Sequence, residues 1–174
     1  GRATRWGVFF TVARPTGTMF DTVVIATDGS GSAQRAVEAA LDLARKFDAT
    51  VHALYVVDPG AVEDSPEDVR DVLERALATT GGHALSFVRE AATGEGETDA
   101  DVVTATRQGD PAPEIQAYAG DVDADLIATG TRGRHGDHAF VLGSVAEKVV
   151  RHAPMPVLSV RQLDSEANPE REAV

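Results

Sequence analysis

Two kinds of apolar pattern alternate along the chain. Short runs rich in β-branched residues, such as TVVIAT at 22–27 and TVHALYVV at 50–57, lack polar alternation and predict strands buried on both faces of a parallel sheet. Between these runs, apolar residues recur every three or four positions, which is typical of amphipathic helices. We therefore expect strands at residues 22–27, 50–57, 101–107, 126–129 and 157–160.

Helix-start signals precede most of the helical patterns. Ser30 or Ser32 can cap a helix that continues to about residue 47, and Ser65, followed by a proline and two acids, predicts the start of the next helix. The adjacent Gly81 and Gly82 are expected to weaken or kink this second helix before it resumes. Two further helices are expected at residues 110–119 and 144–152.

Alternating strands and helices predict an α/β fold: an open five-stranded parallel sheet with helices on both faces and right-handed crossovers. The 174 residues suit one domain, which we place at residues 19–161. Residues 162–174 are expected to be a polar tail. Residues 1–18 hold three arginines and no acid and are expected to lie outside the core. Two explanations for this extension remain: translation from an upstream start, or a signal peptide. No clean small-residue cleavage site follows its arginines, which argues against the signal peptide.

Charge restricts the partners of this chain. The net charge is −12, which disfavours binding to nucleic acid or to an anionic membrane. Only two of the sixteen cationic residues, Lys46 and Lys148, are lysines, and this bias favours a cytoplasmic protein adapted to high salt; an ordinary acidic protein is the alternative. Cysteine is absent, so neither disulfides nor cysteine-based zinc sites are possible.

The loop at residues 130–144, GTRGRHGDHAFVLGS, contains the strongest functional signal. Gly130 and Gly133 follow a strand, and Gly143 and Ser144 open a helix, so the backbone can approach a ligand with its N–H groups near a positive helix end. Arg132 adds positive charge to an acidic chain. We interpret the combination as a phosphate site; the alternative is a set of turn glycines and a helix cap.

A second loop, TDGSGS at residues 27–32, leaves the first strand. Ligands in open α/β sheets bind beyond the carboxyl ends of strands where the winding reverses, so Asp28 and Gly130 are expected to lie side by side. The alternative for Asp28 is a turn residue before a glycine. His135 and His138 could indicate a metal, but solvated loop histidines explain them better because no further ligands stand at suitable spacing.

The pattern Gly130-x2-Gly133-x9-Gly143-Ser144 is similar to the ATP-binding signature of the universal stress protein family. The resemblance extends from Met19 to about residue 161 and includes VVIATDGS, RQGDPAPEI and APMPVLSV. It implies a parallel sheet of strand order 3-2-1-4-5, with the ligand between the first and fourth strands.

The resemblance also implies roles for individual residues. Asp28 matches the acid that contacts ribose and helps to hold a nucleotide-bound Mg²⁺, and the backbone of Val56 matches an adenine contact. The remaining adenine-side residues are Ala26 and Thr27. The triphosphate cradle corresponds to Gly130, Gly133, Gly143 and Ser144, with Val145 beside it and Arg132 at a variable position.

The expected chemistry is binding of ATP, or of AMP or ADP, with slow or no hydrolysis. The chain lacks a Walker motif and its lysine, and no residue outside the 130–144 loop is placed as a base for an attacking water. The expected function is a nucleotide-dependent stress regulator in which the ligand orders residues 132–142 and so changes a surface that partners bind. The resemblance further implies a homodimer that pairs through the edge strand at residues 157–160.

Two other functions stay open at this point. One is an enzyme of the adenine nucleotide alpha hydrolase group; TDGSGS in place of the SGGxDS usual in such enzymes argues against it. The other is an interaction module without nucleotide, and the intact glycine pattern argues against that.

Overall fold

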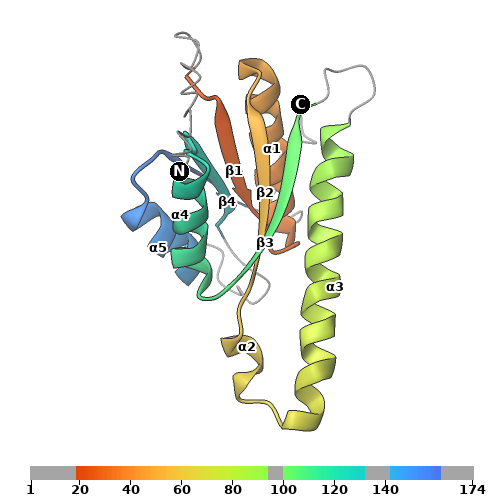
Figure 1. Cartoon of the computed structure of the whole chain (residues 1–174). Coiled ribbons are helices and arrows are strands. Elements are labelled where there is room, and N and C mark those ends of the chain that lie inside the picture. The colour runs from red at the N-terminus through yellow and green to blue at the C-terminus, as the bar shows by residue number, and fades with distance from the viewer. Residues whose placement is uncertain (1–18, 94–99, 132–141, 162–174) are drawn as a thin grey trace, which may run out of the picture.

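The computed structural model describes residues 19–93, 100–131 and 142–161. Its five strands form one parallel sheet of order β3-β2-β1-β4-β5, which confirms the predicted architecture (Figure 1). The apolar runs become central strands because both of their faces are covered. The strands are β1 (Thr22–Ala26), β2 (Thr50–Val57), β3 (Val102–Gln108), β4 (Leu126–Gly130) and β5 (Val157–Val160).

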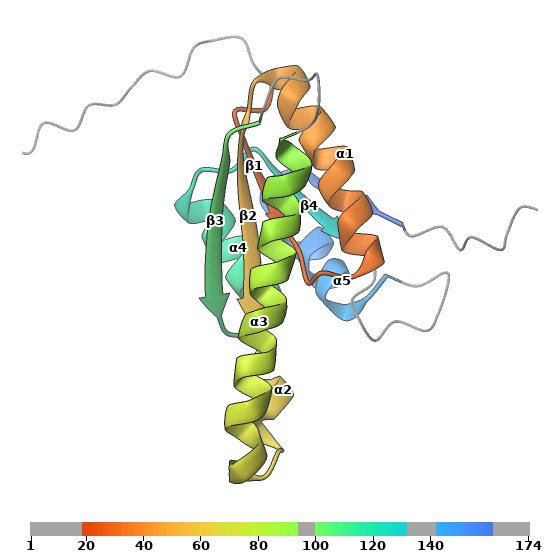
Figure 2. The same ribbon diagram turned by 90° about the vertical axis from the view of Figure 1, so that its right-hand side faces the viewer.

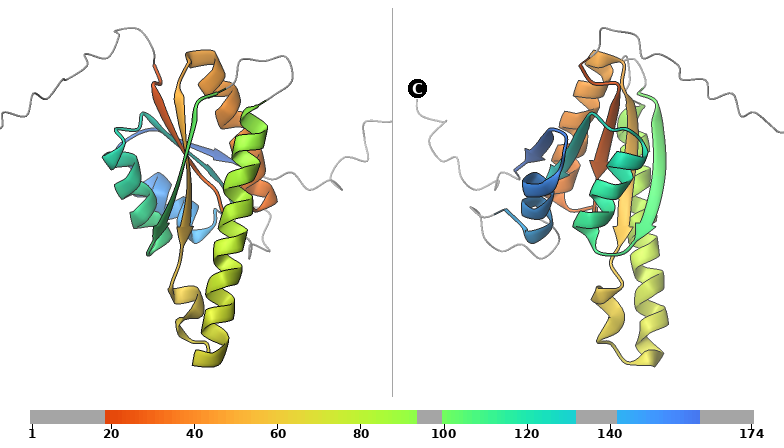
Figure 3. Two further views of the ribbon diagram at one scale, coloured as in Figure 1. Left: turned by 45° about the vertical axis from the view of Figure 1, so that its right-hand side comes forward. Right: turned by 60° about the vertical axis from the view of Figure 1, so that its left-hand side comes forward.

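Helices cover the two faces of the sheet in pairs (Figure 3). α1 (Gly31–Phe47) and α3 (Glu67–Ala92) pack on one face, and α4 (Pro111–Asp121) and α5 (Ser144–His152) pack on the other. Alternate residues of β1 divide between the two cores: Val23 and Ile25 face α1, whereas Val24 faces α4 and α5. A short helix, α2 (Gly60–Glu63), follows β2 and had no counterpart in the expected elements.

α3 is one unbroken helix of 26 residues, so the expected break at Gly81 and Gly82 is wrong. Gly81 is buried, and a Cβ built on it would lie 2.5 Å from Cδ1 of Tyr55. The first glycine therefore lets the helix approach a ring on β2, whereas a Cβ at Gly82 would meet nothing within 4 Å.

The first half of α3 projects with α2 beyond the carboxyl ends of the strands (Figure 2). Ser65 does not cap this helix; the capping position is Pro66, which makes no side-chain hydrogen bond. Val69 and Val72, which belong to the apolar stripe of this helix in the sequence, are 40% and 63% exposed, because at this level the helix has passed the end of the sheet. The projecting segment therefore lies next to the carboxyl ends of the strands, where the candidate site is found.

Candidate functional site

The chain that leaves β1 folds into a tight turn whose polar groups are paired locally. The Thr27 N–H donates to the Leu54 carbonyl at 3.0 Å, and beyond this bond the chain leaves β2. Oδ1 of Asp28 accepts from the Ser30 N–H at 2.9 Å, and Gly29 adopts φ 78°. Asp28 therefore stabilises a turn, which was the alternative to a ligand contact. It also borders the cavity described below.

Gly130 ends β4 where the strand passes closest to α1. A Cβ on Gly130 would lie 2.6 Å from Ser32 Oγ and 2.8 Å from the Ala33 nitrogen. Close helix packing is therefore one physical reason for this glycine. The next residue, Thr131, accepts from the Gly143 N–H at 2.7 Å, so the two ends of the 130–144 loop are held together at its base.

The starts of α1 and α5 differ in how their backbone donors are paired. At α1, Ser30 is the N-cap, and its Oγ accepts from the Ala33 N–H at 3.2 Å. At α5 the N-cap is Gly143, which has no side chain to accept, and the first bond within the helix runs from the Glu147 N–H to the Gly143 carbonyl at 2.9 Å. The first three N–H groups of α5 therefore have no partner within the helix, and they carry the positive end of its dipole. They belong to Ser144, Val145 and Ala146.

The backbone of Val56 faces the space that β1 leaves. In a parallel ladder, successive residues direct their backbone groups toward opposite neighbouring strands. The Leu54 carbonyl accepts from β1, whereas the Val57 carbonyl accepts from the Gly109 N–H at 3.0 Å on the other side. Val56 has the direction of Leu54 but lies past the end of β1, so its N–H and C=O point toward the opening between β2 and β4.

A cavity of about 430 Å³ occupies this opening, at the carboxyl ends of β1 and β4. Its volume lies within the usual range of small-molecule sites. Its lining includes the apolar side chains of Leu54, Ile115 and Val145 and the Gly143–Ser144 start of α5. The hydroxyl of Thr131 is buried at the wall and has no hydrogen-bond partner among the residues that the structure describes.

The charged side chains among the described lining residues are both acids, Asp28 and Asp58. Asp58 Oδ1 accepts from the Gly60 N–H at 2.9 Å and so supports the turn into α2. A polyanion in this cavity would need positive charge from the α5 dipole, from a bound cation or from the arginines of the loop. Arg132 and Gly133 lie outside the described residues, as do the other loop residues from 134 to 141.

The structure places eight of the ten residues named from the sequence on the wall of this one cavity. They are Ala26, Thr27, Asp28, Val56, Gly130, Gly143, Ser144 and Val145. Asp28 and Gly130 line it from adjacent strands, because β1 pairs with β4.

Sequence reasoning missed several other lining residues. Asp58 follows the carboxyl end of β2 and could have been found by the rule that selected Asp28. Ala61 of α2 and Leu77 of α3 had no such signal, because they reach the cavity only through the projecting segment.

Within the described ranges, no helix combines the length and the apolar character needed to cross a bilayer. Nor do those ranges contain a cluster of three or more His, Asp or Glu side chains that could hold a metal ion.

Comparison with known proteins adds a family relationship. The sequence model of the universal stress protein family matches residues 19–161. A universal stress protein of Methanocaldococcus jannaschii is 35% identical over 161 residues, which cover 92% of this chain and 93% of the relative.

Solved structures agree with this relationship. A universal stress protein UspA from Lactobacillus plantarum superposes with a TM-score of 0.68 at 29% identity, over 81% of this chain and 97% of that one. A universal stress protein in complex with cAMP superposes with a TM-score of 0.58 at 27% identity, over 82% and 97% of the two chains.

Proposed function

Because the chain belongs to the universal stress protein family, we propose that it binds an adenine nucleotide, ATP in particular, and acts as a nucleotide-dependent regulator of the stress response. The observation that carries the proposal is the cavity at the exits of β1 and β4, bounded by the open start of α5. The nucleotide in the related structure with cAMP supports the same ligand class.

The apolar part of the cavity suits a base. Leu54, Ile115 and Val145 offer apolar surface for a flat ring, and the outward N–H and C=O of Val56 match an edge that accepts one hydrogen bond and donates another. Adenine presents such an edge at its ring nitrogen and its amino group. Ala26 and Thr27 complete this side of the cavity.

The other end suits phosphates. N–H groups of the first turn of α5 and the positive end of its dipole favour an anion, and the hydroxyls of Ser144 and Thr131 add donors. Asp28 lies on the same wall and could contribute one oxygen to a Mg²⁺ ion carried by the nucleotide. The ion would also offset the repulsion between the phosphates and the acids of the lining.

We propose slow or no hydrolysis. Tight holding of ground-state phosphates does not by itself lower a barrier, since catalysis requires stronger binding of the transition state. The acids of the described lining, Asp28 and Asp58, each accept a backbone N–H and stabilise a turn. A regulator needs only that bound nucleotide changes a surface, and the loop between Thr131 and Gly143 is the segment whose ends flank the phosphate end.

We propose a cytoplasmic homodimer that pairs through β5, the edge strand that follows β4 in the sheet. A nucleotide ligand and the absence of cysteine are both consistent with the cytoplasm. The net charge of −12 and the scarcity of lysine favour work at high salt, where screening reduces self-repulsion.

Calorimetry with MgATP tests the function directly. The parent protein should bind, and Ser144→Ala should weaken binding by about tenfold to a hundredfold, because one hydrogen bond to a charged phosphate is lost. The fold should be intact, since the Ser144 hydroxyl does not cap the helix. The matched control is Ser86→Ala, an exposed helical serine on α3, which should leave the affinity unchanged. Failure of the parent to bind MgATP would contradict the proposal, and rapid pyrophosphate release would favour a hydrolase instead.

A further inference from the structure

Ser32 is a buried polar residue that the proposed ligand contacts leave out. It lies in the first turn of α1, is 1% exposed and does not line the cavity. Capping of α1 is performed by Ser30. The Ser32 hydroxyl instead donates to the backbone carbonyl of Val160, 3.1 Å away at the end of β5. A buried hydroxyl directed at a distant strand requires a structural reason.

The Val160 carbonyl joins three segments at one oxygen. It accepts from the Ser32 hydroxyl and from the Thr131 N–H at 3.0 Å, which uses both of its lone pairs. The first turn of α1, the exit of β4 and the end of β5 are thereby tied together. Arg35, on the same helix, donates to the next carbonyl, that of Arg161, at 2.9 Å.

Further hydrogen bonds connect the Val160 carbonyl to the phosphate end of the cavity. Thr131 donates to Val160 with its N–H and accepts from Gly143 with its C=O at 2.7 Å. Gly143 is the N-cap of α5, so this bond helps to set where the N–H groups of the first turn point. Gly130 makes the arrangement possible, because any side chain there would meet Ser32 Oγ.

Apart from Val145 of α5, the apolar residues proposed to contact the base belong to other elements. Leu54 and Val56 belong to β2, and Ile115 belongs to α4. None of the hydrogen bonds described for the Val160 carbonyl reaches these residues. Loosening that carbonyl should therefore disturb the phosphate end and leave the base end unchanged.

We propose that Ser32 is a positioning residue for nucleotide phosphates: through the Val160 carbonyl and the Thr131–Gly143 bond, it holds the start of α5 in its anion-binding orientation. This inference rests on the proposed nucleotide function. Its physical basis is preorganisation, since donors that are already oriented spare the ligand the cost of ordering them.

The first measurement is the affinity of the full chain for MgATP and for adenosine. Ser32→Ala should weaken MgATP binding by about fivefold, the equivalent of one hydrogen bond, and should leave adenosine binding within about twofold. Ser32→Cys replaces the hydroxyl with a larger group that is a weaker donor, and it serves if Ser32→Ala does not fold. The control is Ser30→Ala, which removes the cap of α1 but not the bond to Val160 and should keep the ratio of the two affinities.

The second measurement needs no ligand. Amide hydrogen exchange at the N–H groups of Thr131 and Gly143 should accelerate in Ser32→Ala and not in Ser30→Ala. Equal loss of both ligands, no loss of MgATP affinity, or unchanged exchange at both amides would overturn the positioning role. A parent that binds neither ligand would instead refute the proposed function, and the exchange rates would still decide whether Ser32 orders this end of the molecule.

Discussion

Ser30 and Ser32 lie two residues apart, yet their hydroxyls serve different parts of the molecule. Ser30 has extended backbone angles, φ −69° and ψ 160°, and its side chain turns back to the helix it caps. Ser32 is already helical, and its side chain points toward β5. Residue type made both of them candidate caps. Their roles differ because Ser30 precedes the first helical residue, whereas Ser32 follows it and lies next to β5.

The adjacent glycines of α3 provide a matched pair for a stability test. Gly82→Ala should raise the free energy of unfolding by up to about 1 kcal/mol, because alanine is the better helix former and nothing lies within 4 Å of the new Cβ. Gly81→Ala should lower it by about 1–3 kcal/mol, since its Cβ would overlap the ring of Tyr55, which is only 3% exposed. Urea unfolding measures both. Equal effects of the two substitutions would show that the approach of Tyr55 is not the reason for the glycine.

At the scale of elements, α1 and α5 both begin beside the cavity but differ at their N-termini. α1 begins with a serine cap whose side chain accepts from one first-turn N–H, whereas α5 begins after a glycine and presents its first N–H groups without an intrahelical acceptor. An anion is favoured at the second helix for this reason. The difference comes from the N-cap residue: Ser30 has a side chain that accepts a hydrogen bond, whereas Gly143 has none.

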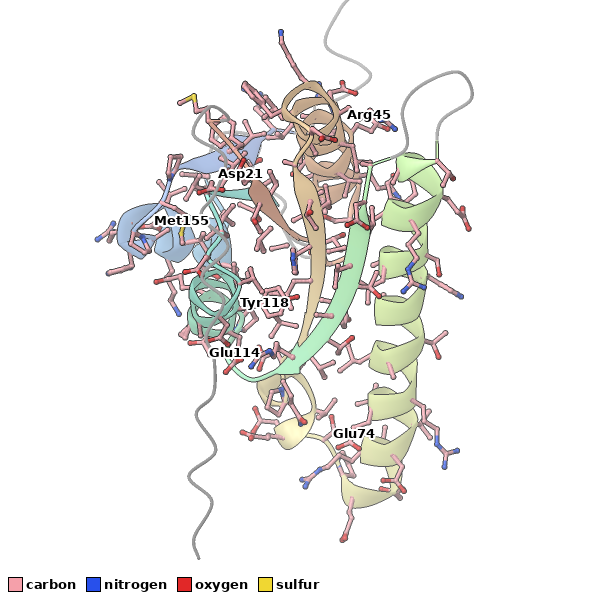
Figure 4. All side chains as sticks on the ribbon, turned by 45° about the horizontal axis from the view of Figure 1, so that its top comes forward. Asp21, Arg45, Glu74, Glu114, Tyr118 and Met155 are labelled. Atoms are coloured by element: carbon pink, nitrogen blue, oxygen red, sulfur yellow. The ribbon has the colours of Figure 1, made fainter. Side chains whose placement is uncertain are left out.

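The packing of α4 on the sheet includes a titratable pair. His52 of β2 lies with its Nδ1 3.0 Å from the hydroxyl of Tyr118, which reaches from α4 toward the strands (Figure 4). Burial lowers the pKa of His52, and the Asp101 carboxylate opposes this in part. Arg107 lies over the Tyr118 ring, 5.3 Å from its centroid, and adds positive charge near the pair.

We expect this pair to make stability depend on pH. Because the pKa of His52 is lower in the folded state than its ordinary value of about 6.5, protons favour the unfolded state. Neutral His52 contributes fully to the free energy of unfolding above pH 6.5, and this contribution declines as the pH falls below 6.5. Urea unfolding between pH 7.5 and 5, at roughly half-unit steps, should show the decline, and His52→Gln should flatten it.

The control for the pH series is His83→Gln, which replaces an exposed histidine of α3. The profile of this variant should follow that of the parent. A parent and a His52→Gln variant with the same slope would contradict the assignment of the effect to the buried pair.

At the scale of the whole molecule, the proposed homodimer depends on which backbone groups β5 directs outward. Pro156 and Val160 direct their carbonyls toward β4, where they accept from Ile127 and Thr131. By alternation along the strand, Leu158 also faces β4, and Ser159 directs its backbone groups outward. The side chain of Leu158 packs against the core on the α1 face, so substitution there would disturb the fold as well as the edge.

We therefore expect Ser159→Pro to produce monomers. Proline removes the outward N–H, which a second copy would need for pairing, and edge positions tolerate it. Sizing with light scattering, together with a thermal melt, measures the outcome. Leu158→Pro is the comparison, because it removes an inward N–H and should lower the melting temperature. A Ser159→Pro variant that stays dimeric with an unchanged melt would reject pairing through this edge.

Much of the architecture could be predicted because its signals are local. β2, α5 and β5 begin and end at the expected residues, since a β-branched run or a capped amphipathic stretch carries its own boundaries. α2 could not be anticipated, because four residues are too few for a periodic pattern. The place of Gly81 inside α3 could not be foreseen either, because the reason for a glycine there is the close approach of the Tyr55 ring on β2.

The sequence by itself determined the order of strands and helices, the acidic character of the chain and the residue types that leave β1 and β4. The tertiary structure decided which of those residues share one cavity, that Ala61 and Leu77 join them, and that Ser32 bonds to Val160. The physical reason is the distance along the chain over which each interaction acts. Hydrophobic periodicity and capping act within a few residues, whereas a cavity and a buried hydrogen bond arise between segments up to 128 positions apart in the chain.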